Sequence, residues 1–228
     1  MTNITPIRNN PQGIRRKQGG LLHEEEHALL PYITTTQTGG GGTCVNQRLV
    51  LYSLANILQA KTVIEIGCAY GDTTLALCAA VSGYGGFIHG FDIWPSEDDY
   101  YNQTAVSERI TAKGYDNVII HKKNSQDADF PEVLDSLCPN KIDFAFIDGD
   151  HHYEAAKNDF CSIYPLMSDN GIIAIHDTLL FPGVKQFIAE LRTTEEITSQ
   201  WEIINIVSGG GSVIQPDGCG MAIMIKTS

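Results

Sequence analysis

The stretch VIEIGCAYGDTT, from Val63 to Thr74, decides how the rest of this 228-residue chain is interpreted. An apolar run that contains Glu65 predicts a buried strand, and a helical pattern with hydroxyl side chains follows it. Gly67 and Gly71 stand between the two, with three residues separating them. A glycine turn lets a ligand approach the backbone, and the N-terminus of the next helix offers N–H groups. The stretch therefore predicts a strand–turn–helix unit that binds a ligand.

Strands and helices alternate along most of the chain. We expect strands over residues 61–66, 86–93, 117–125, 142–147, 171–178, 201–207 and 221–226. Helical spacing predicts helices over 46–60, 73–81, 131–138, 154–167 and 183–192, and another helix after the acidic, aromatic loop that begins at residue 94. This order predicts an α/β, Rossmann-like, doubly wound sheet of seven mostly parallel strands, with an antiparallel last strand and helices on both faces.

Composition limits the classes of partner. The 27 acidic and 15 basic residues give a net charge of −12, which argues against a nucleic-acid partner. No run is long and apolar enough to predict a membrane span, and the opening residues lack the apolar core of a secretory signal. Six cysteines without a Cys-x-x-Cys pair indicate reduced thiols. We expect a cytoplasmic protein with a small-molecule partner, and the sequence leaves a homodimer open.

Polar side chains follow each parallel strand at the edge where right-handed crossovers gather the carboxyl ends. Glu65 and Asp92 stand at the ends of the first two strands. An acid at the end of the second strand can accept both hydrogen bonds of a ribose diol. The dinucleotide fingerprint G-x-G-x-x-G and the phosphate loop G-x-x-x-x-G-K-[ST] are both absent. An acid two residues before the first glycine would repel a pyrophosphate, so it indicates a cationic ligand.

The motif Glu65-Ile-Gly67-Cys-Ala-Tyr-Gly71, together with Asp92, resembles the class I S-adenosylmethionine-dependent methyltransferases from about Asn46 onward. In that family the glycine turn holds the methionine part of the donor, the acid after the second strand holds the ribose, and Ser125 would lie near the adenine. The resemblance implies S-adenosylmethionine as cofactor, and the implied contacts are Glu65, Gly67, Ala69, Tyr70, Gly71, Thr73, Asp92, Ile93, Ser125 and Asp148.

We expect the chain to divide into three parts. Residues 1–22 would form a flexible tail, residues 23–60 a lid or cap segment with a helix, and residues 61–228 the donor-binding methyltransferase domain.

A second group of residues lies in FIDGDHHYEAAKNDF (146–160) and IAIHDT (173–178). These stretches resemble the metal-assisted O-methyltransferases of sugars, macrolides and catechols. The resemblance implies metal ligands at Asp148, His176 and Asp177, and it makes His151 the first choice of general base and Asp150 the second. The family has an acidic pair where this chain has His176-Asp177. The lost charge weakens the case for Mg²⁺ and leaves Mg²⁺, Mn²⁺ or no metal open.

We therefore predict methyl transfer to a hydroxyl of a small natural product or sugar-bearing metabolite. The sequence leaves three alternatives open: N-methylation of a small molecule, a hydroxylase on the same fold, and a protein that binds the donor without turnover. The titratable edge disfavours the last of these, because simple binding needs no cluster of carboxylates and imidazoles.

Overall fold

The computed structural model of the chain describes residues 43–94, 101–206 and 218–227. The predicted tail over 1–22 lies outside the described residues. So do the larger part of the predicted cap segment, part of the loop after Asp92 and most of the glycine-rich loop before the last strand.

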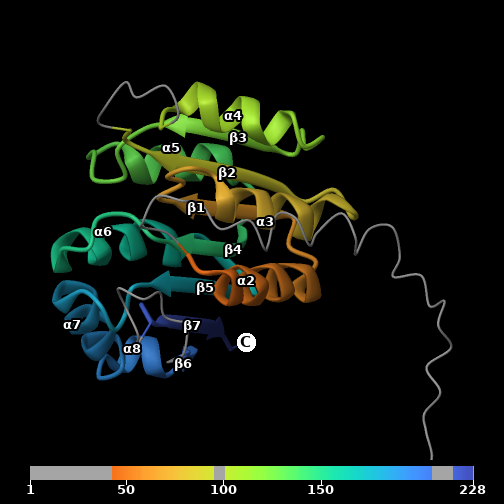
Figure 1. Cartoon of the computed structure of the whole chain (residues 1–228). Coiled ribbons are helices and arrows are strands. Elements are labelled where there is room, and N and C mark those ends of the chain that lie inside the picture. The colour runs from red at the N-terminus through yellow and green to blue at the C-terminus, as the bar shows by residue number, and fades with distance from the viewer. Residues whose placement is uncertain (1–42, 95–100, 207–217, 228) are drawn as a thin grey trace, which may run out of the picture.

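Seven strands form one sheet in the order β3-β2-β1-β4-β5-β7-β6, which Figure 1 shows stacked from β3 at the top to β6 at the bottom. Strand β7 runs antiparallel to both of its neighbours, whereas the pairs from β3 to β5 are parallel. The predicted doubly wound sheet with an antiparallel last strand is therefore confirmed. Their bounds are Thr62–Ile66 (β1), Phe87–Asp92 (β2), Val118–Lys122 (β3), Ile142–Ile147 (β4), Met167–His176 (β5), Trp201–Ile206 (β6) and Met221–Lys226 (β7).

Helices cover both faces of the sheet. Their bounds are Val45–Leu58 (α2), Asp72–Ser82 (α3), Gln103–Thr111 (α4), Phe130–Leu137 (α5), Tyr153–Ile163 (α6), Pro182–Leu191 (α7) and Glu195–Thr198 (α8), and a short 3₁₀ turn (η1) covers Tyr164–Leu166. Sequence reasoning missed α8 because four residues are too few to show a helical period. It also placed the start of β5 four residues late, at Gly171, since the polar residues before that glycine do not look like a strand.

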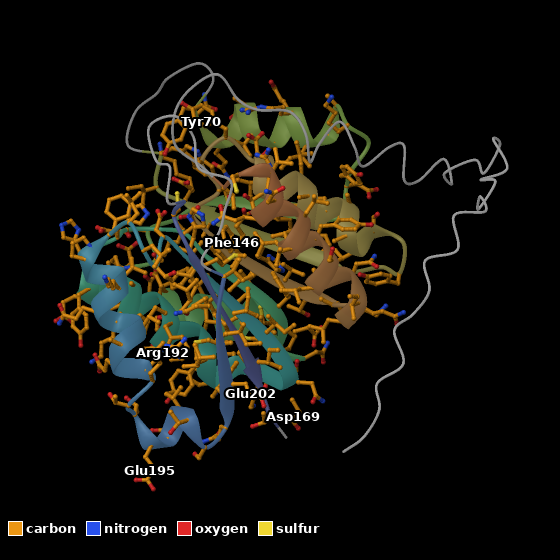
Figure 2. All side chains as sticks on the ribbon, turned by 60° about the horizontal axis from the view of Figure 1, so that its bottom comes forward. Tyr70, Phe146, Asp169, Arg192, Glu195 and Glu202 are labelled. Carbon is orange, nitrogen blue, oxygen red and sulfur yellow. The ribbon has the colours of Figure 1, made fainter. Side chains whose placement is uncertain are left out.

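Two apolar cores lie on opposite faces of the sheet, and β4 contributes to both. Phe144 and Phe146 pack in the core that includes side chains of α2, α3 and α4, whereas Ala145 and Ile147 pack in the core under α5, α6 and α7. Figure 2 shows Phe146 inside the body of the molecule. Alternate side chains of a strand point to opposite faces, so a central parallel strand covered on both sides is apolar throughout. This arrangement holds the carboxyl ends of β1, β4 and β5 together.

None of the helices in the described part of the chain combines the length and apolar character that crossing a bilayer requires.

Candidate active site

The turn after β1 is built around two glycines in the left-handed region. Gly67 has a φ of +88°, and a β-carbon there would lie 2.0 Å from the carbonyl oxygen of Asp148. Gly71 has a φ of +83°, and a β-carbon there would lie 2.8 Å from the Cγ1 atom of Val106. Both positions thus combine a backbone conformation that favours glycine with a close neighbour. The turn brings β1 directly against the end of β4.

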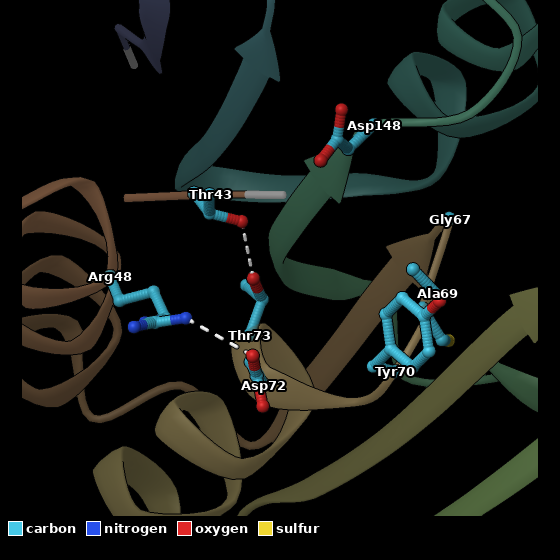
Figure 3. Close-up of a pocket in the computed structure, with 9 residues that line it drawn as sticks. Thr43, Arg48, Gly67, Ala69, Tyr70, Asp72, Thr73 and Asp148 are labelled. Carbon is cyan, nitrogen blue, oxygen red and sulfur yellow. Dashed lines mark hydrogen bonds and ion pairs between the residues drawn. The ribbon is translucent and has the colours of Figure 1, made fainter. Parts of the chain in front are cut away.

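A pocket opens beside this turn, at the carboxyl edge of the sheet (Figure 3). Five of the predicted donor contacts line it, namely Gly67, Ala69, Tyr70, Thr73 and Asp148. The remaining lining residues are Thr43, Arg48, Cys68 and Asp72. The pocket is therefore formed by the glycine turn, the start of α3, the end of β4 and the segment that leads into α2.

Asp92 fastens the end of β2 to the glycine turn. Its Oδ2 atom accepts a hydrogen bond from the Ala69 N–H at 2.8 Å, and its Oδ1 atom accepts one from the Trp94 N–H at 2.9 Å. Ala69 and Trp94 both have positive φ values, 46° and 35°. Asp92 therefore stabilises two unusual backbone positions, and each oxygen retains a second acceptor site.

The predicted contacts Ile93 and Ser125 lie outside the pocket lining. Ile93 is 51% exposed beside the end of β2. Ser125 follows β3, where its hydroxyl accepts a hydrogen bond from the Gln126 Nε2 atom at 3.3 Å.

Glu65 is fully buried beneath the turn and does not line the pocket. Neither of its carboxyl oxygens has a hydrogen-bond partner among the residues that the structure describes. Burial, with the nearby Asp148 and Asp92 carboxylates adding to it, raises the pKa of Glu65 to about 8. At neutral pH Glu65 is therefore mostly protonated and contributes little charge to the neighbouring pocket.

Two imidazoles and two carboxylates meet where β4 and β5 end. The His151 Nε2 atom lies 2.7 Å from Asp177 Oδ2 and 3.7 Å from Asp148 Oδ1. The His176 Nδ1 atom lies 3.0 Å from Asp148 Oδ1 and 3.3 Å from Asp177 Oδ1. The structure thus brings His151, Asp148, His176 and Asp177 together, as the sequence predicts.

In this cluster, the carboxylates favour the charged form of the imidazoles, and the imidazoles favour the charged form of Asp177. The nearby Asp148 and Asp177 carboxylates favour the charged form of His151 and raise its pKa to about 9. Burial disfavours the charged form of His176, but the same two carboxylates outweigh it and raise the pKa of His176 to about 10. Burial likewise disfavours the Asp177 carboxylate, yet the two imidazoles hold its pKa below the ordinary value. Without a ligand, both imidazoles are therefore protonated on both ring nitrogens and positively charged at neutral pH.

Donor atoms of this cluster are spaced for a divalent ion. Those of Asp148, His151 and Asp177 lie within 4.8 Å of one another, and so do those of His176, Asp177 and Cys219. Within the described ranges, the buried Asp177 Oδ1 atom accepts no hydrogen bond. The set mixes oxygen, imidazole and thiol, which fits Mn²⁺ and other transition metals better than Mg²⁺.

Asp150 forms a different contact. Its Oδ1 atom lies 2.5 Å from the Nδ1 atom of His152, whose side chain is 89% exposed. This pair lies at the surface, apart from the contacts that join His151 to Asp177.

Sequence reasoning missed the contribution of α2. The Gln47 Oε1 atom accepts the backbone N–H of Cys44 at 3.1 Å and lies 3.1 Å from the His176 Nε2 atom. Gln47 lies on the buried stripe that Leu51 and Ala55 continue at helical spacing. The sequence did offer a signal for Gln47, because it is a polar residue at a position that helical spacing assigns to the buried, apolar face of the helix.

Phe181 and Cys219 also escaped prediction. The Phe181 ring stacks on His151 with centroids 3.9 Å apart and planes 10° apart. No pattern in the sequence links either residue to the site.

The strand order and the pocket beside the glycine turn define a class I methyltransferase fold. A family model described as "Methyltransferase domain" matches residues 64–178, half of the chain, and the chain belongs to this family. The family and fold implied by the sequence motif are confirmed.

Solved structures agree with this fold. The O-methyltransferase TomG from Streptomyces achromogenes, involved in tomaymycin synthesis and solved with S-adenosylmethionine, is 17% identical with a TM-score of 0.66, and 90% of each chain is covered. The O-methyltransferase from Bacillus cereus, solved with S-adenosylhomocysteine, is 15% identical with a TM-score of 0.67, covering 90% of this chain and 91% of that one.

A curated relative, "Uncharacterized protein y4gI" of Sinorhizobium fredii, is 27% identical over 145 residues, which is 60% of this chain. The chain spans 16% and 42% of the lengths of the two curated relatives that it matches.

Proposed function

We propose that the protein transfers a methyl group from S-adenosylmethionine to a hydroxyl of a small natural product or sugar-bearing metabolite. One observation carries the proposal: Asp148 both lines the pocket beside the glycine turn and contacts the imidazole–carboxylate cluster. A donor held in the pocket would therefore lie next to groups that can position a hydroxyl and remove its proton. TomG and the Bacillus cereus enzyme, solved with the donor or its product, support the same cofactor here.

His151 is the proposed general base. Asp177 holds its Nε2 atom at 2.7 Å, and Phe181 stacks on the ring, so the imidazole has a defined orientation. The sulfonium methyl is already activated, so alignment and proton removal are the main tasks, and a positioned base contributes on the order of 10²–10⁴-fold. Without a metal ion, the two carboxylates raise the pKa of His151 to about 9, so metal-free turnover should increase with pH up to that value.

Asp148, His176 and Asp177 are the proposed ligands of a divalent ion, with Mn²⁺ fitting them better than Mg²⁺. When bound, such an ion would supply a Lewis acid that lowers the pKa of a hydroxyl. Gln47 supports this role for His176. Its Oε1 atom accepts the Cys44 N–H, so it can accept the Nε2–H of His176 and direct Nδ1 toward the two carboxylates.

The acceptor would approach an apolar surface. Leu179 and Leu180 are 39% and 37% exposed directly after the cluster, and the Phe181 ring follows them. These side chains suit an acceptor with an apolar or aromatic body that presents a hydroxyl to His151.

The test of the donor is calorimetric titration of the purified protein with S-adenosylmethionine, in EDTA and then with Mn²⁺ or Mg²⁺. We expect saturable donor binding and a metal-dependent heat. No donor binding in any of these buffers would refute the proposed function. Release of S-adenosylhomocysteine with a panel of catechols, hydroxylated aromatics and macrolide sugars then identifies an acceptor.

His151→Ala should abolish turnover of that acceptor while the dissociation constant for the donor changes no more than a few-fold. His152→Ala is the matched control. The His152 side chain is next to His151 in the sequence, but it is 89% exposed and pairs with Asp150. Undiminished turnover in His151→Ala would exclude His151 as the base.

A further inference from the structure

Cys219 is a partly buried thiol beside the imidazole–carboxylate cluster. Its donor atom and those of His176 and Asp177 lie within 4.8 Å of one another. His176 and Asp177 stand at the end of β5, whereas Cys219 stands two residues before the start of β7. His176 and Asp177 already have a role in the proposed function, but Cys219 has none.

Strand pairing holds Cys219 against the end of β5. Met221 is paired with His176, and the Leu179 N–H donates a hydrogen bond to the Cys219 carbonyl at 2.9 Å. Gly220 has a φ of +74°, and a β-carbon there would lie 2.5 Å from Leu179 Cγ, so the two segments can approach this closely only with glycine at this position. The backbone of Cys219 is therefore fixed by the sheet, and sites built on such elements hold their ligands precisely.

Asp177 directs an unpartnered oxygen toward the same space. The residue is 6% exposed, and its Oδ1 atom has no hydrogen-bond partner among the residues that the structure describes. This atom lies 3.3 Å from the His176 Nδ1 atom. Burying a carboxylate oxygen without a partner is costly, and such an atom in a folded protein indicates a functional role or an ion. A cation between these side chains would pair it.

The donor set of this group matches a thiophilic divalent ion. Zn²⁺ in proteins is bound by thiolate sulfur, imidazole nitrogen and carboxylate oxygen, whereas Mg²⁺ and Mn²⁺ are suited by oxygen ligands. In the metal-free protein, burial and the neighbouring Asp177 carboxylate favour the protonated form of the Cys219 thiol. Binding of the ion would form a bond to sulfur and release the thiol proton to solvent.

We propose that Cys219 is a further ligand of the ion held by His176 and Asp177, and that its sulfur makes the site select Zn²⁺ and chemically similar ions over Mn²⁺. The inference rests on the proposed function, because it extends the metal ligands given there. It also assigns a role in the site to the segment that enters β7.

A thiol that only packs beside the cluster makes a different prediction. Its replacement by serine would change the affinities for Zn²⁺ and Mn²⁺ to the same extent, and no metal–sulfur bond would form. Co²⁺ reports such a bond directly, because a thiolate ligand gives it a near-ultraviolet charge-transfer band that oxygen and nitrogen ligands do not give.

The experiment titrates Co²⁺ alone into the EDTA-treated full chain, as wild type, Cys219→Ser and the control Cys161→Ser. Cys161 is an exposed cysteine of α6. We expect the charge-transfer band in wild type and Cys161→Ser and its loss in Cys219→Ser. In competition with a metal indicator, Cys219→Ser should weaken Zn²⁺ at least about tenfold, the lower end of what loss of even an outer-shell partner costs, and Mn²⁺ less than about 3-fold.

A second variant keeps the test decisive if Cys219→Ser does not fold. Replacing Cys44 and Cys161 by serine leaves Cys219 as the one cysteine that is not buried, since the others are Cys68, Cys78 and Cys138. The band should persist in this double variant.

Absence of the band in wild type, its loss in the double variant, its retention in Cys219→Ser, or equal losses of Zn²⁺ and Mn²⁺ affinity would overturn the assignment of Cys219. Binding of S-adenosylmethionine by the wild-type protein would then leave the proposed function standing. Failure to bind S-adenosylmethionine refutes the proposed function, and with it the role of Cys219 in methyl transfer, whatever the Co²⁺ spectrum shows.

Discussion

Replacing Glu65 by glutamine should change how the stability of this protein depends on pH. The side chain is fully buried, and neither carboxyl oxygen has a hydrogen-bond partner in the part of the chain that the structure describes. Burial raises its pKa from 4.5 to about 8. The folded protein therefore holds a proton on Glu65 over a pH range in which the unfolded chain has lost it.

The sign and size of the effect follow from this difference. Below pH 4.5 Glu65 is protonated in both the folded and the unfolded chain. The stabilisation of the folded state by the neutral carboxyl is then fully present. Between pH 4.5 and about 8 the unfolded chain ionises and the folded chain does not, so stability falls as pH rises. The loss should total on the order of 4–5 kcal/mol and then level off above pH 8.

The assay is urea denaturation of wild type and Glu65→Gln at several pH values from 5 to 8.5, without donor. The two proteins share every other titrating group, so the difference between their free energies of unfolding isolates Glu65. The cost of burying the amide is the same at each pH. Glu65→Gln should gain several kcal/mol relative to wild type between pH 5 and pH 8.5. A difference that stays constant across this range would refute the proposed protonation of Glu65.

Two further substitutions test the glycine turn and its anchor. Gly67→Ala should destabilise the fold by roughly 2–4 kcal/mol and remove donor binding, because its β-carbon would lie 2.0 Å from the Asp148 carbonyl oxygen at a φ of +88°. Gly83→Ala is its control: no described atom lies within 4 Å of the added carbon, so the unfolding midpoint in urea should stay the same or increase. Asp92→Ala should weaken S-adenosylmethionine at least about tenfold in calorimetry, since it removes a ribose acceptor and releases the Ala69 and Trp94 N–H groups. Unchanged affinity would contradict the ribose assignment.

The class of fold, and the edge of the sheet where the polar side chains gather, follow from the pattern of residues along the chain. Alternating strands and helices admit few arrangements once crossovers are right-handed, so side chains that follow parallel strands must share one edge. For this reason Gly67, Asp148 and His176 could be assigned to one region although they are far apart in the chain. Glycines at 67 and 71 signalled a tight turn, because few other residues adopt positive φ without strain.

Which side chains meet at that edge, and in which protonation state, depends on how the helices pack against the sheet. Helical spacing showed that α2 has a buried face, but the direction in which α2 crosses the sheet is set by packing against α3. That packing places Gln47 on His176 and Arg48 in the pocket. Burial likewise converts Glu65 from an expected anion into a carboxyl that is mostly neutral, because the pKa depends on surroundings that no local pattern records. Patterns of neighbouring residues indicate which side chains take part in the site. Their contacts and charges depend on segments that are distant in the sequence.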